Sequence, residues 1–329
     1  MAVGKAIGLG LVDSATLARL ANGISVVLLG TAALAIARRG RPVLFVVLSM
    51  PMLLFSAAGI TQDGLMLACA AFMVALVGRA AAGAPLSRAQ QIGIGALMGL
   101  IVASRPPYAP LLALLFIRPL RGSGALGLLP LAFALAIPAG WVLLGAAPVA
   151  TTFRAADGVA SHGQLAYLID HPGAVLRVAA ATLWNRGAWH YREFVGILGW
   201  EDTELPYAAY WAAALALATA VALVCSSPGP PLAPRELAAI AGAVVASIAA
   251  VFGALYLTWT PVGSPEVEGV QGRYFLPLAA LASLALPAVV RAKPSTAVGH
   301  AGAAGWILLF ALAVGNAIML YVVYARYYG

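Results

Sequence analysis

The chain has 329 residues, of which 63% are hydrophobic and 9% are charged, and its net charge is +8. Soluble domains hold about 25% charged residues, so this composition excludes a soluble protein and indicates an all-α polytopic membrane protein. The positive charge does not indicate nucleic-acid binding, because the basic residues lie in short loops between apolar stretches, where anionic membrane lipids are the expected partners.

Ten apolar stretches follow one another along the chain, and we expect about ten transmembrane helices. A full crossing requires about 20 residues. The fourth and fifth stretches are shorter and are separated by Pro106 and Pro107, so two crossings and a re-entrant hairpin are both compatible with them. The predicted spans are residues 16–37, 42–59, 64–79, 89–104, 107–118, 124–146, 207–227, 236–258, 274–291 and 302–325.

The charges between these stretches fall on two sides. Loops after the odd-numbered stretches are rich in arginine and hold one acidic residue, Glu236, so they are predicted to be cytoplasmic. The other loops and both termini hold the remaining acidic residues, and we expect any chemistry at this outer face. Because the first span then runs from outside to inside, we also expect that this chain lacks a helix and an outer loop that would precede Met1.

The whole chain, residues 1–329, is interpreted as one integral membrane domain with two long outer segments. The first segment, residues 147–206, contains a stretch from Pro172 to Arg186 that predicts a helix lying partly in the membrane interface. The second segment, residues 259–273, is rich in turn-forming residues. We therefore expect a partly helical outer loop above a helical bundle.

Two patterns inside the spans indicate packing rather than chemistry. Gly93-x-Gly95-x-x-x-Gly99 superficially resembles a dinucleotide-binding loop, but no strand precedes it, and the spacing of Gly95 and Gly99 is typical of helix packing in membranes. Cys69 and Cys225 lie within apolar stretches and predict neither a disulfide nor a metal site.

Aromatic and charged residues gather after the predicted interfacial helix. The stretch WNRGAWHYRE at 184–193 contains Arg186 and His190, and GWED at 199–202 contains Trp200 and Asp202. An aromatic belt at the membrane boundary explains the tryptophans about as well as a site that stacks on sugar rings and binds phosphate.

Two further polar positions lie at predicted outer helix ends. Asp63 follows a tight helical hairpin, where capping the N-terminus of the third span is the simplest role and a second role stays compatible. Arg105 precedes Pro106, Pro107 and Tyr108. An arginine at membrane depth indicates either a specific function or a side chain that reaches the interface.

The densest polar segment is WTPVGSPEVEGVQGRYFLP at 259–277. Within nine residues it carries Glu266, Glu268, Gln271, Arg273 and Tyr274, at the point where a loop enters a helix. Backbone N–H groups at the start of a helix favour anions, and an arginine there adds a bidentate phosphate contact. We therefore expect an anion-binding site at this entry.

These segments resemble a bacterial membrane-protein family known as domain of unknown function 2142. The similarity rests on QGRYFLP at 271–277 with WTPVG just before it, on FVGILGWEDTELP at 194–206, on TQDG at 61–64 and on RPPY at 105–108. The family motifs have proline where Gln62 stands and lysine where Arg105 stands. The similarity extends over essentially the whole chain, in order.

The resemblance implies a GT-C glycosyltransferase-like protein in the bacterial inner membrane. Such enzymes transfer a sugar from a polyprenyl-phosphate carrier to a cell-envelope glycan or protein at the outer face. In that group the usual catalytic base is a carboxylate in a first outer loop, which has no counterpart in this sequence. A transporter or flippase of lipid-linked envelope precursors and a non-catalytic envelope-assembly subunit are the alternatives.

The resemblance and the residue types together give a set of candidate site residues. Asp202 and Glu268 are the catalytic candidates, Arg105 and Arg273 are expected to hold phosphate, and Asp63 is a structural residue that could also belong to the site. No cofactor is required, and a divalent cation held by Asp63 or Glu268 is compatible with the sequence. The expected substrate-binding residues are Arg105, Tyr108, Arg186, His190, Trp200, Gln271, Arg273 and Tyr274.

Overall fold

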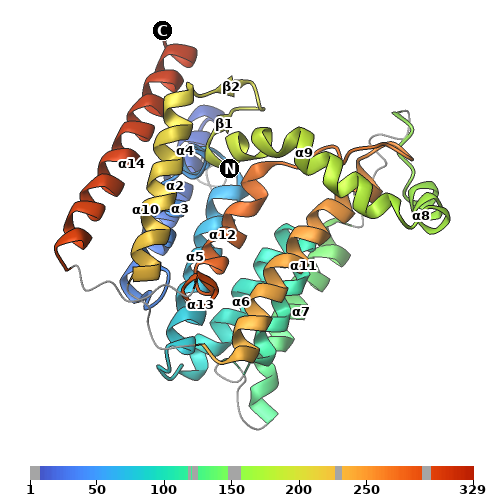
Figure 1. Cartoon of the computed structure of the whole chain (residues 1–329), viewed down its shortest axis with the longest axis horizontal. Coiled ribbons are helices and arrows are strands. Elements are labelled where there is room, and N and C mark those ends of the chain that lie inside the picture. Colours follow the sequence, from blue (N-terminus) through green and yellow to red (C-terminus); the bar gives the residue numbers. More distant parts are fainter. Residues whose placement is uncertain (1–7, 118–119, 121–124, 147–156, 227–231, 291–297) are drawn as a thin grey trace.

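The computed structural model describes residues 8–117, 120, 125–146, 157–226, 232–290 and 298–329, and most of them are helical (Figure 1). Residues 147–156 of the first outer segment lie outside the described part of the chain. The first half comprises α2 (Leu11–Ile36), α3 (Arg41–Leu48), α4 (Pro51–Ala58), α5 (Gln62–Ala81), α6 (Arg88–Ser104), the 3₁₀ helices η1 (Pro106–Phe116) and η2 (Ala125–Leu128), α7 (Leu129–Trp141) and the π-helical turn η3 (Val142–Ala146). The second half comprises α8 (Ser161–Asp170), α9 (Ala174–Val195), β1 (Ile197–Leu198), β2 (Thr203–Glu204), α10 (Tyr207–Ser226), α11 (Pro234–Thr258), the 3₁₀ helix η6 (Gly272–Phe275), α12 (Leu276–Ala282), α13 (Leu286–Val290) and α14 (Val298–Tyr327).

The helical membrane-protein class is confirmed, and the number of crossings is only partly supported. Within the described residues, α2, α5, α10, α11 and α14 are long and apolar enough to cross a membrane. A sixth crossing is counted if α3 and α4, which meet at 51°, form one bent span. The other predicted spans are also helical, but their helices are shorter or change helix type along their length. Ten crossings therefore stay a prediction.

Helix α5 lies at the centre of the bundle. In an apolar 18-residue stretch of α5, 78% is buried, whereas the corresponding shares are 17% for α2 and 22% for α11. Gly64 allows α4 to pass close by, because a Cβ at this position would lie 3.0 Å from the Cα atom of Ala57. The outer helices expose large apolar side chains instead, such as Trp306 and Phe310 on α14, as expected of helices that face lipid.

Helices α6 and α7 pack through the small residues that the sequence singled out. A Cβ on Gly95 would lie 2.6 Å from the carbonyl carbon of Pro130, and a Cβ on Gly99 would lie 2.9 Å from the carbonyl oxygen of Phe133. A Cβ on Gly93 would have no neighbour within 4 Å. The packing interpretation of Gly95 and Gly99 is thus confirmed, since only glycine permits this approach of the two backbones.

Among the described residues, the arginine-rich turn at 38–41 and the outer residues around Tyr207 lie at opposite ends of the bundle. Arg38 and Arg41 line a cavity together with Leu223, near the end of α10. The other end of α10, at Tyr207, follows directly on the β1–β2 hairpin and α9 (Figure 1). A 20-residue helix is about 30 Å long, so α10 alone separates these two groups of residues by roughly the thickness of a membrane.

Helix α9 lies across one end of the bundle (Figure 1). The prediction of a helix here is confirmed, but the helix begins at Ala174 and continues to Val195, nine residues beyond the expected end at Arg186. Leu176, Leu183 and Trp184 are 77%, 58% and 90% exposed. Large exposed apolar side chains on a helix that crosses the bundle end fit the predicted position in the membrane interface.

We expect α8 to lie outside the membrane and the first turn of α6 to lie inside. A membrane-impermeant maleimide should label Ala160→Cys in intact cells, and it should label Ala89→Cys only after permeabilisation. Both alanines are exposed, so the pair compares the two sides of the membrane and not two degrees of burial. The parent chain, with Cys69 and Cys225, gives the background. Labelling of Ala89→Cys in intact cells would contradict the predicted orientation.

Candidate functional site

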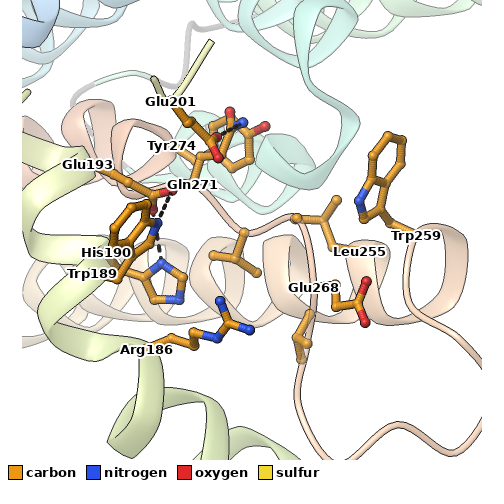
Figure 2. Close-up of a pocket in the computed structure, with 13 residues that line it drawn as sticks. Arg186, Trp189, His190, Glu193, Glu201, Leu255, Trp259, Glu268, Gln271 and Tyr274 are labelled. Atoms are coloured by element: carbon orange, nitrogen blue, oxygen red, sulfur yellow. Dashed lines mark hydrogen bonds and ion pairs between the residues drawn. The ribbon is translucent and has the colours of Figure 1, made fainter. Parts of the chain in front are cut away.

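One face of α9 carries a regular row of polar and aromatic side chains. Arg186, Trp189, His190 and Glu193 are spaced i, i+3, i+4 and i+7, which places them on the same side of a helix. All four line a cavity of about 570 Å³ (Figure 2). Arg186 and the part of α9 beyond the predicted end therefore form one wall of this cavity.

The opposite wall comes from the end of α11 and from the loop that follows it. Figure 2 shows Glu268, Trp259 and Leu255 across the cavity from α9. Glu201, from the turn between β1 and β2, and Tyr274, from η6, complete the lining. The cavity thus gathers side chains from the two segments that were predicted to be outer loops.

Gly272 lets the second outer loop reach α9. A Cβ at this position would overlap the carbonyl oxygen of His190 and would lie 2.5 Å from the backbone nitrogen of Phe194. Any larger residue would push the loop away from the helix. The glycine of the Gln-Gly-Arg-Tyr segment is therefore required by the close contact of two backbones.

Glu193 is the hydrogen-bonding centre of this contact. Its side chain is 4% exposed, and its Oε2 accepts a hydrogen bond of 2.7 Å from the backbone N–H of Gly272. The same oxygen lies 3.1 Å from Nδ1 of His190, and Oε1 accepts from Nε1 of Trp189 at 2.9 Å. Three neighbours converge on one buried carboxylate, and two of them, the Gly272 N–H and Nε1 of Trp189, can only donate.

Further buried hydrogen bonds fasten the loop over residues 259–271. Thr182 of α9 is fully buried and accepts a hydrogen bond of 2.9 Å from the backbone N–H of Val267. Gln164 of α8, also fully buried, accepts one of 3.0 Å from Gly263. These bonds satisfy loop N–H groups that would otherwise be buried without partners, so the loop has a defined shape.

A second polar group lies beneath the cavity, where α5 begins and α6 ends. The carboxylate of Asp63 lies 2.5 Å from Nη2 of Arg105 and 3.5 Å from Nε of Arg273. The expected capping role of Asp63 is wrong, because the N-cap of α5 is Thr61 and no side chain caps it. Two arginines against one carboxylate leave one positive charge in this group.

Tyr274 connects this group to the cavity. The guanidinium carbon of Arg105 lies 4.0 Å from the centre of the Tyr274 ring, a cation–π contact. The hydroxyl of Tyr108, which is fully buried, donates a hydrogen bond of 2.6 Å to the backbone oxygen of Tyr274. Arg105 and Tyr108 therefore fix the ring that forms part of the cavity wall.

Arg105 and Arg273 themselves do not line the cavity. They border a small void of about 10 Å³ next to Asp63, which has room for about one water molecule. In this arrangement their guanidinium groups face a protein carboxylate. Their expected role as phosphate ligands stays a prediction, and the structure places them one layer below the cavity lining.

Asp202 and Trp200 lie away from the cavity. Asp202 lies in the hairpin turn, where its Oδ1 accepts hydrogen bonds of 3.2 Å from the N–H of Trp200 and from the hydroxyl of Thr203. Its Oδ2 accepts one of 2.8 Å from Arg326 of α14, and this bond lowers the pKa of Asp202. Trp200 is 99% exposed. Asp202 therefore joins the hairpin to α14 and, of the two catalytic candidates, Glu268 alone lines the cavity.

Two more polar contacts lie at the edge of the cavity. Arg186 is 55% exposed at its side chain and lies 3.1 Å from Oε2 of Glu266. Hydrogen bonds from Asn185 and then from Arg186 lower the pKa of Glu266. The side-chain amide of Gln271 donates to Glu201, which ties the cavity edge to the β1–β2 turn.

The chain matches a family model described as "Predicted membrane protein (DUF2142)" over residues 1–282. The chain belongs to this DUF2142 family. No curated protein and no solved structure matches it. The family match covers every candidate site residue, from Asp63 to Tyr274.

Several cavity residues of this DUF2142 protein were not among the sequence candidates: Trp189, Glu193, Glu201, Leu255 and Trp259. The i, i+3, i+4, i+7 spacing from Arg186 would have revealed the first two, but it applies only if the helix continues past Arg186. Glu201 and Trp259 come from turns, where sequence periodicity gives no indication of direction.

Metal ligands are not clustered in the described part of this DUF2142 protein. No group of three His, Cys, Asp or Glu side chains there is placed to hold a metal ion. A divalent cation at Asp63 or Glu268 stays an untested expectation.

We expect Gly272→Ala to separate the second outer loop from α9. The added methyl group overlaps two backbones, and overpacking of this kind costs about 1–3 kcal/mol. Hydrogen–deuterium exchange should become faster across residues 259–275, and the Tm should fall. The control is Gly187→Ala on α9, where a Cβ has no neighbour within 4 Å. Equal protection in the parent and in Gly272→Ala would contradict the close contact.

Proposed function

We propose that this protein is a GT-C-like membrane glycosyltransferase of about ten spans in the bacterial inner membrane. It moves a sugar from a polyprenyl-phosphate carrier to a cell-envelope glycan or protein, and the transfer takes place in the cavity between α9 and residues 259–274. The observation that carries the proposal is the content of this cavity: one guanidinium, two indole rings and three carboxylates at one end of an apolar bundle.

The cavity residues match the parts of a lipid-linked sugar. Arg186, whose Nε contacts Glu266, supplies a guanidinium whose other N–H groups can bind phosphate through charge-assisted hydrogen bonds. Trp189 and Trp259 offer aromatic faces for the apolar faces of sugar rings, and Glu201 and Glu268 can accept hydrogen bonds from sugar hydroxyls. A cavity for a purely apolar lipid would not need this set.

The surroundings of Arg186 suit a carrier whose chain stays in the bilayer. Leu183 and Trp184, one turn earlier on α9, are 58% and 90% exposed and offer an apolar surface to lipid. The polyprenyl chain can therefore stay in the membrane while its phosphate reaches Arg186. This geometry supports a site entered from the membrane edge.

The proposed reaction is a displacement at the anomeric carbon. An acceptor hydroxyl forms the new C–O bond, and the bond between the anomeric carbon and the phosphate oxygen breaks. The electron pair leaves with polyprenyl phosphate, whose negative charge is stabilised by Arg186. A transporter or flippase and a non-catalytic assembly subunit would bind the same carrier without breaking this bond.

Binding of the carrier tests the proposal first. In nanodiscs, titration with polyprenyl monophosphate should change the tryptophan fluorescence, since Trp189 and Trp259 line the cavity. Arg186→Gln should weaken the affinity roughly 10- to 100-fold, because a hydrogen bond to a charged group contributes about 1.5–3 kcal/mol. The matched control is Arg177→Gln, an exposed arginine of α9 that does not line the cavity.

A sugar-transfer assay is the second test of the proposed function. The parent should release polyprenyl phosphate from radiolabelled polyprenyl-phosphate hexoses in the presence of a cell-envelope extract, and polyprenol without phosphate should not bind. Binding without release would favour the transporter or the assembly subunit. Equal affinity of the parent and Arg186→Gln would contradict the proposed phosphate site.

A further inference from the structure

We infer that His190, held in place by Glu193, is the group that removes the proton from the acceptor hydroxyl. This inference rests on the proposed transferase function, and it names a catalytic residue for it. His190 was expected only as a substrate-binding residue, and the carboxylates Asp202 and Glu268 were the sequence candidates for the catalytic role.

The two nitrogens of His190 have different surroundings. Nδ1 lies 3.1 Å from Oε2 of Glu193, whereas Nε2 is buried and has no hydrogen-bond partner among the described residues. The residue is 8% exposed and lines the cavity. Figure 2 shows the ring turned so that one nitrogen meets Glu193 and the other points toward Arg186. A buried polar atom without a partner is costly, and because His190 lines the cavity, this atom points to a ligand group that completes it.

Glu193 fixes which nitrogen carries the hydrogen. Its Oε2 also accepts from the backbone N–H of Gly272 at 2.7 Å, and its Oε1 accepts from Trp189 at 2.9 Å. A carboxylate that receives these bonds is an acceptor, so Nδ1 of His190 is the donor in their contact. In neutral His190 the lone pair is then on Nε2, the buried nitrogen that has no hydrogen-bond partner among the described residues, in a residue that lines the cavity. A base oriented by a carboxylate is a common arrangement for activating a nucleophile.

The ring of His190 is also held by packing. It lies edge-on to Phe252 of α11, with ring centres 6.3 Å apart, and Gly272 packs against its backbone oxygen. The imidazole is therefore oriented before substrate binds. A proton acceptor placed in this way is effective because little reorganisation is needed in the transition state.

Other ionisable groups of the cavity form contacts of their own. Glu193 already accepts three hydrogen bonds, Glu201 accepts one from Gln271, and the ring of Tyr274 contacts Arg105. Glu268, the carboxylate that the sequence singled out as catalytic, also lines the cavity and is the competing candidate. Arg186, one turn before His190 on the same face of α9, supplies the positive charge for the departing phosphate.

The step balances with these groups alone. The O–H bond of the acceptor breaks, and its proton goes to Nε2 of His190. The acceptor oxygen bonds to the anomeric carbon, and the bond from that carbon to the phosphate oxygen breaks. Glu193 stabilises the imidazolium that results, and the proton later passes to solvent.

The test compares binding and turnover in the full chain. With a polyprenyl-phosphate hexose as donor, His190→Gln should lower kcat by about 10²–10⁴-fold and leave the affinity for polyprenyl monophosphate unchanged, since general-base catalysis typically contributes this factor. Glu193→Gln should lower kcat at least tenfold. The control His162→Gln changes an exposed histidine of α8 and should have no effect. In His190→Ala, added imidazole should restore part of the turnover, which a merely structural role would not allow.

The outcomes separate this inference from the proposed function. If the parent transfers sugar and His190→Gln transfers it equally well, the inference is overturned and Glu268→Gln identifies the competing base. If His190→Ala loses turnover without rescue and loses binding as well, His190 is structural and the inference is also overturned. If the parent binds no polyprenyl monophosphate and transfers no sugar, the proposed function itself fails, and this inference fails with it.

Discussion

The arrangement of the site depends on one buried carboxylate. Glu193 accepts hydrogen bonds from the backbone of Gly272 and from Trp189, lies 3.1 Å from Nδ1 of His190, and so joins α9 to the loop between α11 and α12. A buried carboxylate is costly unless it is hydrogen-bonded, so these contacts stabilise the junction of α9 with the loop. The glycine makes the approach sterically feasible, and the carboxylate makes it stable. The cavity follows from this contact, because each of its two main walls belongs to one of the joined segments.

A second layer of charge supports the cavity from below. Asp63, Arg105 and Arg273 come from three helix ends and form one ion-paired group with a surplus positive charge. Their contact with the cavity is through Tyr274, whose ring lies against Arg105. Only 9% of the residues in this chain are charged. A cluster of charged side chains at the edge of an apolar bundle therefore indicates a specific role and not only a contribution to solubility. Through Tyr274 it contacts the cavity wall.

Composition and charge were sufficient to predict the class of protein, the segregation of arginines at one end and the packing role of Gly95 and Gly99, because these properties depend on local sequence. The polar residues of 266–274 were also recognised. The sequence could not show that Asp63 meets two arginines, since their approach depends on helix ends far apart in the chain. The predicted helix ended at Arg186, just before Gly187, whose helix propensity is low. Contacts of Glu193 with the second outer loop stabilise the added turns. The sequence also could not show that Asp202 pairs with Arg326, because Arg326 lies more than a hundred residues away in the chain.

The most direct test of the account is where the carrier's phosphate binds. A polyprenyl phosphate with a photoreactive diazirine beside the phosphate should be incubated with the protein in nanodiscs and irradiated, and the labelled peptides identified by mass spectrometry. The account predicts labels on α9 around Arg186–Glu193 and on the loop around Val267–Tyr274, and competition by unlabelled polyprenyl phosphate. Specific labelling confined to the arginine-rich turn at Arg38–Arg41, or no competed labelling at all, would contradict it.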